Sequence, residues 1–230
     1  MIISDSSPLA AWQAASFHLI KNGREDYNLL VTFPCASAID ESPLEEFNPR
    51  RILGTDFDMA RNVANTIFPK KTFLNSKSRD DFYARYLRAH SRASQKRWGT
   101  YFERLISFGD SEVNQLENVI VALSTWKLTY RAAMNVHLSS ADIDPLKPLG
   151  SPCLQYIQFN CPTDDQIDLL AVYRNHDYCN KVLGNYFGLS RLLNFVCTET
   201  GRTAGQVSCL SAHAYYDIST KNMKILTGAN

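Results

Sequence analysis

Several features that would narrow the class of protein are missing from this sequence. None of its six cysteines forms a C-x-x-C pair, so it has neither the ligand spacing of a zinc ribbon nor a disulfide framework. No run of about 18 apolar residues could span a membrane, and residues 1–8 lack the basic and apolar segments of a secretory signal. We therefore expect a reduced, cytoplasmic protein with no metal and no membrane contact.

An excess of one charge and the common catalytic motifs are also absent. Lys and Arg total 24 against 23 Asp and Glu, so nothing favours a nucleic-acid partner. The sequence contains no G-x-G-x-x-G, P-loop, H-E-x-x-H or G-x-S-x-G motif. A small anion held by two or three arginines is compatible with this balance. Chemistry must therefore be sought in less common arrangements of residues.

What is present fits one folded domain over residues 1–230. Hydrophobic residues make up 45% of the chain and charged residues 20%, which is the balance of a globular protein. A chain of this length buries about 70% of its unfolded surface and needs neither disulfides nor a metal for stability. The sequence shows no linker, so we expect a single domain.

The alternation of helical and extended patterns predicts the fold class. Helices are predicted over Pro8–Asn22, Asp56–Phe68, Asp80–Gln95, Asn114–Lys127 and Val182–Thr200. Strands are predicted over Asn28–Phe33, Ala133–Leu138, Leu154–Asn160, Gln166–Tyr173 and Val207–Tyr216. Residues 40–55 and 70–79 are predicted to be loops. This irregular mixture indicates an α+β protein built on a mixed β-sheet.

Polar and reactive residues border the apolar strands of the second half of the chain. Pro152 cannot donate to a sheet ladder and suits the first residue of a strand, which puts Cys153 at a strand end facing a possible cleft. Considered alone, Cys153 could equally be an apolar filler, since cysteine is often buried. The next strand ends in Tyr173-Arg174-Asn175-His176-Asp177, and the last carries Ser211-Ala212-His213-Ala214-Tyr215. An arginine near a cysteine favours the thiolate, which is the nucleophilic form.

Four of these pieces stand in the order and spacing of a known family. Pro152-Cys153, Arg174-Asn175-His176-Asp177, Asn185 and His213-Ala214-Tyr215 resemble the signature of thymidylate synthases and the related pyrimidine-nucleotide hydroxymethylases. Asp177 follows Arg174 by three positions and Asn185 follows it by eleven, as in the family pattern. The resemblance covers residues 131–217 and is greatest to the short, archaeal-type thymidylate synthases.

The resemblance implies an architecture and an assembly. It implies a thymidylate synthase-like α+β domain whose mixed sheet is covered by helices on one face. The other face of the sheet would pack against a second copy of the chain in a homodimer. In the family two adjacent arginines reach across this interface to the partner's nucleotide phosphate. Only Arg131 stands at that place here, next to Tyr130.

The resemblance also implies a transferase activity. The chain would transfer a one-carbon unit, as methyl or hydroxymethyl, to carbon 5 of a pyrimidine nucleoside monophosphate. The donor would be 5,10-methylenetetrahydrofolate or a related methylene-tetrahydropterin. Asn185 favours uracil (dUMP or UMP), because an Asp there would better match the amino group of cytosine. Asn can reorient its amide, so CMP and dCMP stay possible.

The same resemblance assigns roles to individual residues. Cys153 would add its thiolate to carbon 6 of the base, and Asn185 would read the base edge and stabilise the oxygen at position 4. Asp177 would contact the cofactor or order the waters that move protons. Arg174 would hold the 5′-phosphate, and His213 and Tyr215 would bind the sugar hydroxyl. Substrate binding is thus expected from Arg131, Arg174, Asn175, Asn185, His213 and Tyr215.

The sequence departs from the family pattern in three places. The usual Y-G-x-x-W segment is replaced by Trp98-Gly99-Thr100-Tyr101-Phe102, so Tyr101 is the candidate for the tyrosine that assists removal of the carbon 5 proton. The N-terminal glutamate of the pattern has only Glu45 or Glu46 as a stand-in. The long-form members continue further beyond the H-x-Y motif, so we expect either a different use of the cofactor or a site without their closing tail.

Two other functions stay open from the residues alone. A nucleotide-binding homologue would keep the phosphate and sugar contacts and lack turnover. A cysteine-dependent nucleotide hydrolase would use Cys153 with His176 or His213 and would have no need of Asn185.

Overall fold

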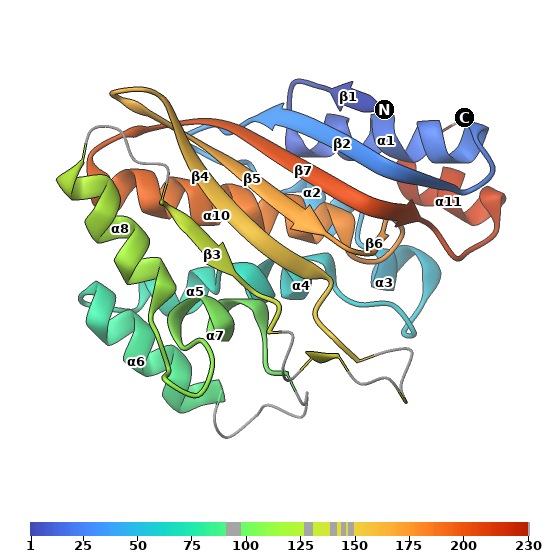
Figure 1. The fold of residues 1–230 in the computed structure, drawn as a ribbon. Helices are drawn as coiled ribbons and strands as arrows, with labels where there is room; N and C mark the ends of the chain where they lie inside the picture. Colours follow the sequence, from blue (N-terminus) through green and yellow to red (C-terminus); the bar gives the residue numbers. More distant parts are fainter. Residues whose placement is uncertain (91–97, 127–130, 139–141, 144–145, 147–149, 230) are drawn as a thin grey trace.

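The fold is a single mixed α/β domain built around an open β-sheet of seven strands in the described part of the chain (Figure 1). The computed structural model describes residues 1–90, 98–126, 131–138, 142–143, 146 and 150–229. The strands lie in the order β1-β2-β7-β5-β4-β3, and β6 pairs with β7. They are β1 (Ile2–Ser4), β2 (Glu25–Pro34), β3 (Ala133–Asn135), β4 (Leu154–Thr163), β5 (Gln166–Tyr173), β6 (His176–Asp177) and β7 (Thr203–Tyr215).

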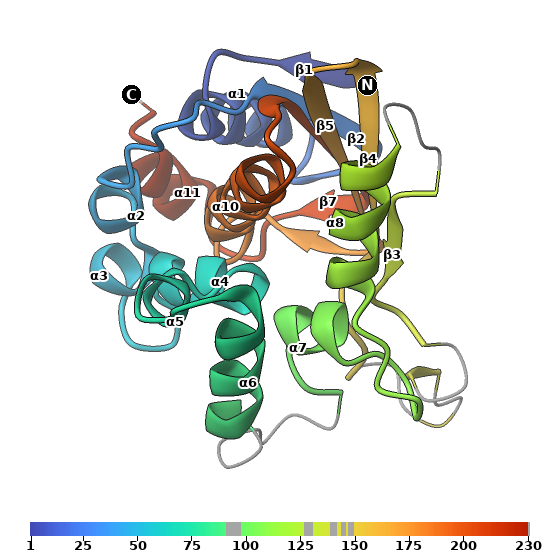
Figure 2. The same cartoon turned by 90° about the vertical axis from the view of Figure 1, so that its left-hand side faces the viewer.

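Helices gather on one side of this sheet, as the two perpendicular views show (Figures 1 and 2). They are α1 (Pro8–Lys21), α2 (Pro43–Glu46), α3 (Pro49–Leu53), α4 (Ala60–Ile67), α5 (Lys70–Leu74), α6 (Arg79–His90), α7 (Tyr101–Ile106), α8 (Gln115–Thr125), α10 (Val182–Thr200) and α11 (Thr220–Thr227). The long helix α10 packs against β5, β7 and α4. It therefore joins the sheet to the helical layer.

The pairing of the strands brings distant parts of the chain to one edge of the sheet. β4 and β5 are antiparallel, with Leu154 opposite Tyr173, whereas β5 and β7 are parallel, with Tyr173 opposite Ser211. A parallel pair needs a crossover connection, which α10 supplies. The start of β4 and the ends of β5 and β7 consequently lie side by side.

The two faces of the sheet differ in how they are covered. Every second residue from Ile167 to Tyr173 in β5 is buried against the helices, which is the alternation of a strand with one covered face. The opposite face carries apolar side chains in register across three strands, with Leu30 beside Leu210 and Leu210 beside Val172. These side chains are half-buried. No helix in the described ranges covers this open face (Figure 2).

Helices α4 and α10 approach each other closely because α10 carries glycines four residues apart. A Cβ atom at Gly184 would lie 2.5 Å from the carbonyl oxygen of Ala60 and 2.6 Å from Cβ of Val63. A Cβ at Gly188 would lie 2.9 Å from the carbonyl oxygen of Ala64. Residues i and i+4 share a helix face, so the two glycines form one groove. This groove fixes the position of α4 relative to the sheet.

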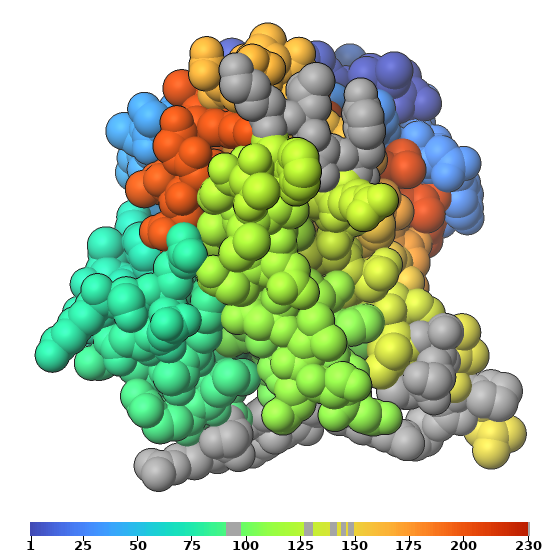
Figure 3. Space-filling view, turned by 60° about the vertical axis from the view of Figure 1, so that its left-hand side comes forward, coloured from blue at the N-terminus to red at the C-terminus, as the bar shows by residue number. Residues whose placement is uncertain are grey.

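A helical layer at one end of the sheet completes the fold. α7 and α8 pack on each other and on β3, and the light-green segment lies beside the teal α6 in the space-filling view (Figure 3). The rings of Phe68, Phe82, Phe102 and Phe195 pack together beneath this layer. Among the helices that the structure describes, none is long and apolar enough to cross a membrane.

The long elements confirm the sequence predictions, and several short ones correct them. The predicted helices over 8–22 and 182–200 and the strand over 166–173 match α1, α10 and β5. The predicted loop over 40–55 is wrong, because it contains α2 and α3, and the predicted loop over 70–79 contains α5. Pro43 and Pro49 stand at the first turns of α2 and α3, where a missing N–H is tolerated. α7, α11, β1 and β6 were not predicted, and the predicted ends Gln95 and Lys127 lie outside the described residues.

Candidate functional site

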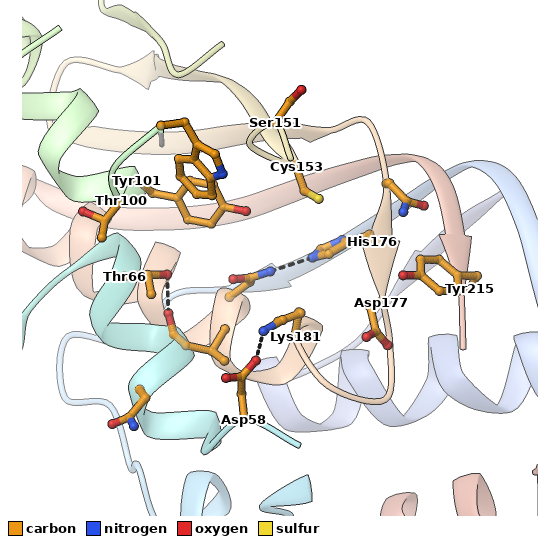
Figure 4. Close-up of a pocket in the computed structure, with 15 residues that line it drawn as sticks. Asp58, Thr66, Thr100, Tyr101, Ser151, Cys153, His176, Asp177, Lys181 and Tyr215 are labelled. Carbon is orange, nitrogen blue, oxygen red and sulfur yellow. Dashed lines mark hydrogen bonds and ion pairs between the residues drawn. The ribbon is translucent and has the colours of Figure 1, made fainter. Parts of the chain in front are cut away.

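A cavity of about 290 Å³ lies where the start of β4 and the ends of β5 and β7 meet α4 and α10 (Figure 4). This volume is near the lower end of the range for small-molecule sites. The C-terminal wall of the cavity consists of Ser151, Cys153, Asn175, His176, Asp177, Lys181, Asn185 and Tyr215. The N-terminal wall consists of Asp58, Asn62, Val63, Thr66, Trp98, Thr100 and Tyr101.

The C-terminal wall collects many of the residues that the sequence singled out. They come from the turn before β4, the connection from β5 to β6, the first turn of α10 and the end of β7. The sheet pairing described above explains why these segments converge. The predicted site residues that line the cavity are Cys153, Asn175, Asp177, Asn185 and Tyr215.

The turn that presents Cys153 is held by Arg174. Nε of Arg174 donates to the carbonyl oxygen of Pro152 at 3.1 Å, and Nη2 donates to that of Ser151 at 3.1 Å. The backbone N–H of Arg174 also donates to the carbonyl oxygen of Cys153 at 2.9 Å. Arg174 does not line the cavity. Its observed contacts orient the Pro-Cys turn and place its positive charge beside the carbonyl groups of residues 151 and 152.

Cys153 differs from the other cysteines in its surroundings. It lines the cavity and is only partly buried. Burial raises the pKa of Cys35 to about 11 and that of Cys197 to about 12, so these thiols stay protonated at neutral pH. None of the six cysteines is in a disulfide. Within the described ranges, no group of three His, Cys, Asp or Glu side chains could hold a metal ion.

Tyr101 faces Cys153 from the N-terminal wall (Figure 4). Its ring packs against Trp98 with 5.2 Å between centroids. Burial raises the pKa of Tyr101 above its ordinary value, so the hydroxyl keeps its proton at neutral pH. The segment that departs from the family pattern therefore places a protonated tyrosine beside the cysteine.

Asn185 projects from the first turn of α10 and contacts a buried histidine. Its Nδ2 lies 3.0 Å from Nε2 of His176 (Figure 4). Burial lowers the pKa of His176 to about 3, so the imidazole is neutral at neutral pH. The other amide atom, Oδ1 of Asn185, is buried and has no hydrogen-bond partner among the described residues.

Asp177 is a half-buried carboxylate on the same wall. Its Oδ1 accepts from the backbone N–H of Cys179 at 3.0 Å and from that of Asn180 at 3.2 Å. Burial raises the pKa of the Asp177 carboxyl above its ordinary value, although these two N–H groups act in the opposite direction. The carboxylate is thus fixed in place by backbone donors at the cavity wall.

His213 lies behind the wall, and Tyr215 lies on it. Nδ1 of His213 lies 2.8 Å from Oδ1 of Asn175, and its Nε2 lies 3.0 Å from Oε2 of Glu25. The ring of His213 is stacked between Tyr215, at 5.2 Å, and Tyr27, at 5.0 Å. His213 does not line the cavity. Its observed contacts position Asn175 and Tyr215, which do.

Arg131 lies far from the cavity of its own chain. Ala133 pairs with Gln158 in the antiparallel β3–β4 ladder, so residue 131 is level with residue 160, seven positions along β4 from Cys153. At about 3.3 Å per residue this separation is roughly 23 Å. Arg131 is exposed and shares the open face of the sheet with Ala133 and Asn135.

The suggested glutamates do not reach the cavity. Oε1 of Glu45 accepts from Nε of Arg61 at 2.8 Å on the surface, and neither Glu45 nor Glu46 lines the cavity. On the N-terminal wall the polar residues that α4 contributes are Asn62 and Thr66. The expectation that Glu45 or Glu46 stands in the site is therefore wrong, because α4 presents uncharged polar groups there.

Sequence reasoning missed the pair that joins the two walls. Lys181 forms an ion pair with Asp58 (Figure 4), and the backbone N–H of Asp58 donates to Oδ1 of Asn180 at 2.8 Å. A signal for Asn62 and Thr66 was present, because they stand four residues apart on a helix whose other face is apolar. The Asp58–Lys181 pair left no comparable signal, since its two residues are more than a hundred positions apart.

Comparison with known proteins gives a consistent picture. No protein family model matches the chain. A protein of Methanococcoides burtonii named "Putative thymidylate synthase" is 33% identical over 131 residues, which is 56% of this chain and 58% of that protein. Proteins with the same name from Methanosarcina mazei (30% over 118 residues, 50% of this chain, 52% of that protein) and Methanosarcina acetivorans (29% over 149 residues, 64% of this chain, 65% of that protein) also match.

These matches are partial in length and agree in name. They cover between 52% and 65% of the length of the curated relatives just described. A further protein of that name, from Methanosarcina barkeri, is 30% identical over 118 residues. The four matches support a thymidylate synthase-like family for this chain.

Proposed function

We propose that the protein transfers a one-carbon unit to carbon 5 of a pyrimidine nucleoside monophosphate. The observation that carries this proposal is the presence of Cys153 and Asn185 on one wall of one cavity. A nucleophilic thiol and an amide that can read a base edge are the two groups that such a reaction needs. The names of the archaeal relatives support the same reaction class.

Cys153 activates the base by covalent addition. Carbon 5 of uracil is a weak nucleophile. The thiolate of Cys153 forms a bond from Sγ to carbon 6 of the base. The electron pair of the C5–C6 double bond then shifts toward carbon 5 and the oxygen at position 4. Carbon 5 then bonds to the carbon that the donor would supply and loses its proton to water, and the bond between that carbon and the donor breaks with its electron pair going to the donor. Once a hydride, or a hydroxide from water, has completed the transferred group, departure of the thiolate restores the double bond and the free enzyme.

Asn185 and Arg174 support this step by charge and position. Asn185 donates to the oxygen at position 4, where negative charge develops during addition. Arg174 holds the 151–153 turn through two backbone carbonyls, and its positive charge favours the thiolate form of Cys153. We place the nucleotide phosphate near Arg174 and the sugar near Asn175 and Tyr215.

The walls fit a reduced folate or pterin as the carbon donor. Asp177 presents a half-buried carboxylate held by two backbone N–H groups, which suits the amino-pyrimidinone edge of a pterin. The rings of Trp98 and Tyr101 offer flat apolar surfaces opposite it. When bound, this cofactor supplies the methylene carbon and, for a methyl product, also the hydride. A hydroxymethyl product takes its oxygen from water instead.

The arrangement of the two histidines argues against a cysteine hydrolase. A hydrolase needs an imidazole nitrogen open to the thiol as general base. Both nitrogens of His176 lie within hydrogen-bonding distance of Asn185 and Ser211, and those of His213 are within reach of Asn175 and Glu25. We therefore favour the transferase over this alternative.

A substrate panel tests the proposal directly. The protein is incubated with UMP, dUMP, CMP or dCMP and methylenetetrahydrofolate, and the products are read by mass. We expect at least one nucleotide to gain a methyl or hydroxymethyl group and to release tritium from labelled carbon 5. Binding of nucleotides without tritium release would instead identify a nucleotide-binding homologue. Release of phosphate or free base would identify a hydrolase.

We also propose that two chains pack through the open face of the sheet. Leu30, Leu210 and Val172 form an apolar row on that face. Arg131 lies on the same face and is too far from Cys153 to serve its own cavity. In a twofold dimer contacts are reciprocal, so if one Arg131 reaches the cavity of the other chain, both do. Light scattering of the purified protein gives the assembly state.

A further inference from the structure

A line of buried polar side chains runs from the cavity wall into the core. Nδ2 of Asn185 lies 3.0 Å from Nε2 of His176, and Nδ1 of His176 lies 2.9 Å from Oγ of Ser211. The His176 ring stacks on Tyr173 with 3.9 Å between centroids and 5° between planes. All four side chains are buried, and a buried polar atom that lacks a hydrogen-bond partner costs free energy.

The neutral state of His176 leaves two possible arrangements of the line. A neutral imidazole has one donor and one acceptor nitrogen. If Nδ1 carries the proton, Nε2 accepts from the NH2 group of Asn185 and leaves the carbonyl oxygen Oδ1 to the cavity. If Nε2 carries the proton, it donates to Oδ1 and turns the NH2 group toward the cavity. The two arrangements present opposite hydrogen-bonding groups to a ligand.

The surroundings favour the first arrangement. Nδ2 is the atom that faces the ring, and Oδ1 is buried without a hydrogen-bond partner among the residues that the structure describes. Ser211 then accepts from Nδ1–H of His176 across the 2.9 Å contact, since a hydroxyl oxygen has lone pairs for this bond. A buried oxygen without a partner is unfavourable unless a ligand donates to it.

We propose that His176, held by Ser211, is a positioning residue that fixes the amide of Asn185 with Oδ1 toward the cavity, so that the site selects uracil over cytosine. Uracil presents a ring N–H beside a carbonyl. The N–H donates to Oδ1, and the carbonyl accepts the second N–H of the Asn185 amide. Cytosine has an unprotonated nitrogen in that place, so two lone pairs would face each other.

The inference has two parts that depend differently on the proposed function. The orientation of the Asn185 amide follows from the hydrogen bonds of the free protein alone. The selection of the base rests on the proposed function, because it requires a pyrimidine in the cavity. Two measurements separate these parts.

The first measurement reads the tautomer of His176 in the protein without ligand. Protein labelled with 15N-histidine contains five histidines, and the His176→Gln variant identifies the signals of His176. Long-range 1H–15N correlations distinguish a protonated Nδ1 from a protonated Nε2. We expect protonated Nδ1 and unprotonated Nε2 at neutral pH. Protonation at Nε2 would overturn the proposed orientation of Asn185, whatever the protein binds.

The second measurement compares affinities for the two bases. We expect dUMP and UMP to bind roughly 100-fold or more tightly than dCMP and CMP in calorimetry, as for a site built to bond an N–H. Ser211→Ala removes the acceptor for Nδ1–H, so both tautomers form and the ratio should fall by about tenfold. Ser211→Thr keeps a hydroxyl and should keep the ratio.

A matched control lies on the same strand. Ser208 of β7 points to the open face of the sheet and accepts from Nε2 of Gln206 at 3.0 Å, so Ser208→Ala should leave the ratio unchanged. Equal losses of affinity for uracil and cytosine in Ser211→Ala would mean that Ser211 is only structural, and would overturn the selection. Failure of all four nucleotides to bind would reject the proposed function and the selection with it. The 15N spectrum would then still decide the amide orientation.

Discussion

The two walls of the cavity are built in different ways. The C-terminal wall is made of strand ends and the first turn of α10, and its side chains are tied to one another, as Asn185 is to His176 and Asn175 is to His213. The N-terminal wall is made of one turn-rich segment and α4, which is held at a distance set by the glycines of α10. On that wall Asn62 is exposed and Thr66 is half-buried.

This difference indicates that the C-terminal wall and α4 have different roles in binding. A group that must meet a reacting atom needs a rigid support. The backbone bond from Arg174 to Cys153 provides one at Cys153, and the buried contact with His176 provides one at Asn185. A wall that only holds the far side of a ligand can be formed by a helix docked against its neighbour. We therefore assign the reacting base to the C-terminal wall and the carbon donor to the space between the two walls.

The largest expected effect comes from removing the thiol of the C-terminal wall. We expect Cys153→Ala to lower kcat by roughly 1,000-fold or more, the scale of losing a nucleophile. Nucleotide affinity in calorimetry should change little, because binding rests on other side chains. Cys161→Ala changes a cysteine at the other end of β4 and should keep full turnover. Normal turnover in Cys153→Ala would make Cys153 an apolar filler and remove the chemical meaning of this wall.

Mixing two inactive variants tests whether the C-terminal wall is complete within one chain. If Arg131 serves the partner's cavity, mixed dimers of Cys153→Ala and Arg131→Ala chains contain one intact site and one site with both defects. Random re-pairing makes half of the dimers mixed, so activity should return to about a quarter of wild type. Activity is followed after unfolding and refolding the variants together. No recovery over the separately refolded variants would place both residues in the same site or remove Arg131 from it.

The buried histidine should give the fold a measurable dependence on pH. Burial lowers the pKa of His176 from 6.5 to about 3, so between these values the unfolded chain binds a proton that the folded chain excludes. Stability therefore falls as the pH falls through this window. From pH 7 to pH 4.5 we expect a loss of about 2.5 kcal/mol in the free energy of unfolding. Urea unfolding at a series of pH values measures it.

Two variants assign this dependence to one residue. His176→Gln should flatten that part of the profile, whereas His137→Gln, at a half-buried histidine outside the cavity, should leave it in place. The same slope in wild type and His176→Gln would show that other groups cause it. Such a result would also weaken the distinction between the hydrogen-bonded C-terminal wall and the N-terminal wall.

The contact between the walls should tolerate little added volume. In Gly184→Ala the new methyl group would meet the carbonyl oxygen of Ala60 at 2.5 Å, so α4 must move away from α10. Overpacking of this kind costs about 1–3 kcal/mol of stability, measured by thermal or urea unfolding. Thr198→Ala changes an exposed position of the same helix and should stay within about 0.5 kcal/mol of wild type. Equal stabilities would mean that the glycines do not set the distance between the walls.

The same contrast explains what the sequence could and could not predict. Asp177 and Asn185 stand three and eleven residues from Arg174. Because these spacings are short, they can be recognised directly in the sequence. The position of α4 depends instead on its contact with Gly184 and Gly188, which no local pattern reveals. The helices at 43–53 were missed because prolines suggest loops although they also begin helices.

The roles of the site residues were harder to predict from the sequence than their positions near the cavity. Arg174 and His213 were expected to touch substrate, and the structure shows them bonded to backbone carbonyls and to Asn175. A sequence gives the residue type at a strand end but not the hydrogen bonds that occupy it. The contact between His176 and Asn185 was not predicted, because it depends on how α10 packs over the end of β5.

The smallest effects should come from the N-terminal wall. The Thr66 hydroxyl donates to the carbonyl oxygen of Val63 in its own helix at 2.7 Å, so Thr66→Val should leave the fold stable within about 0.5 kcal/mol. Asn62→Ala trims an exposed amide that lines the cavity. For both variants we expect a rise of roughly two- to fivefold in KM for the reduced folate, the scale of one hydrogen bond. KM for the nucleotide and kcat should stay close to wild type, since the base contacts the other wall. A fall in kcat comparable to that of Cys153→Ala would give α4 a catalytic group, and the division of labour between α4 and the C-terminal wall would no longer hold.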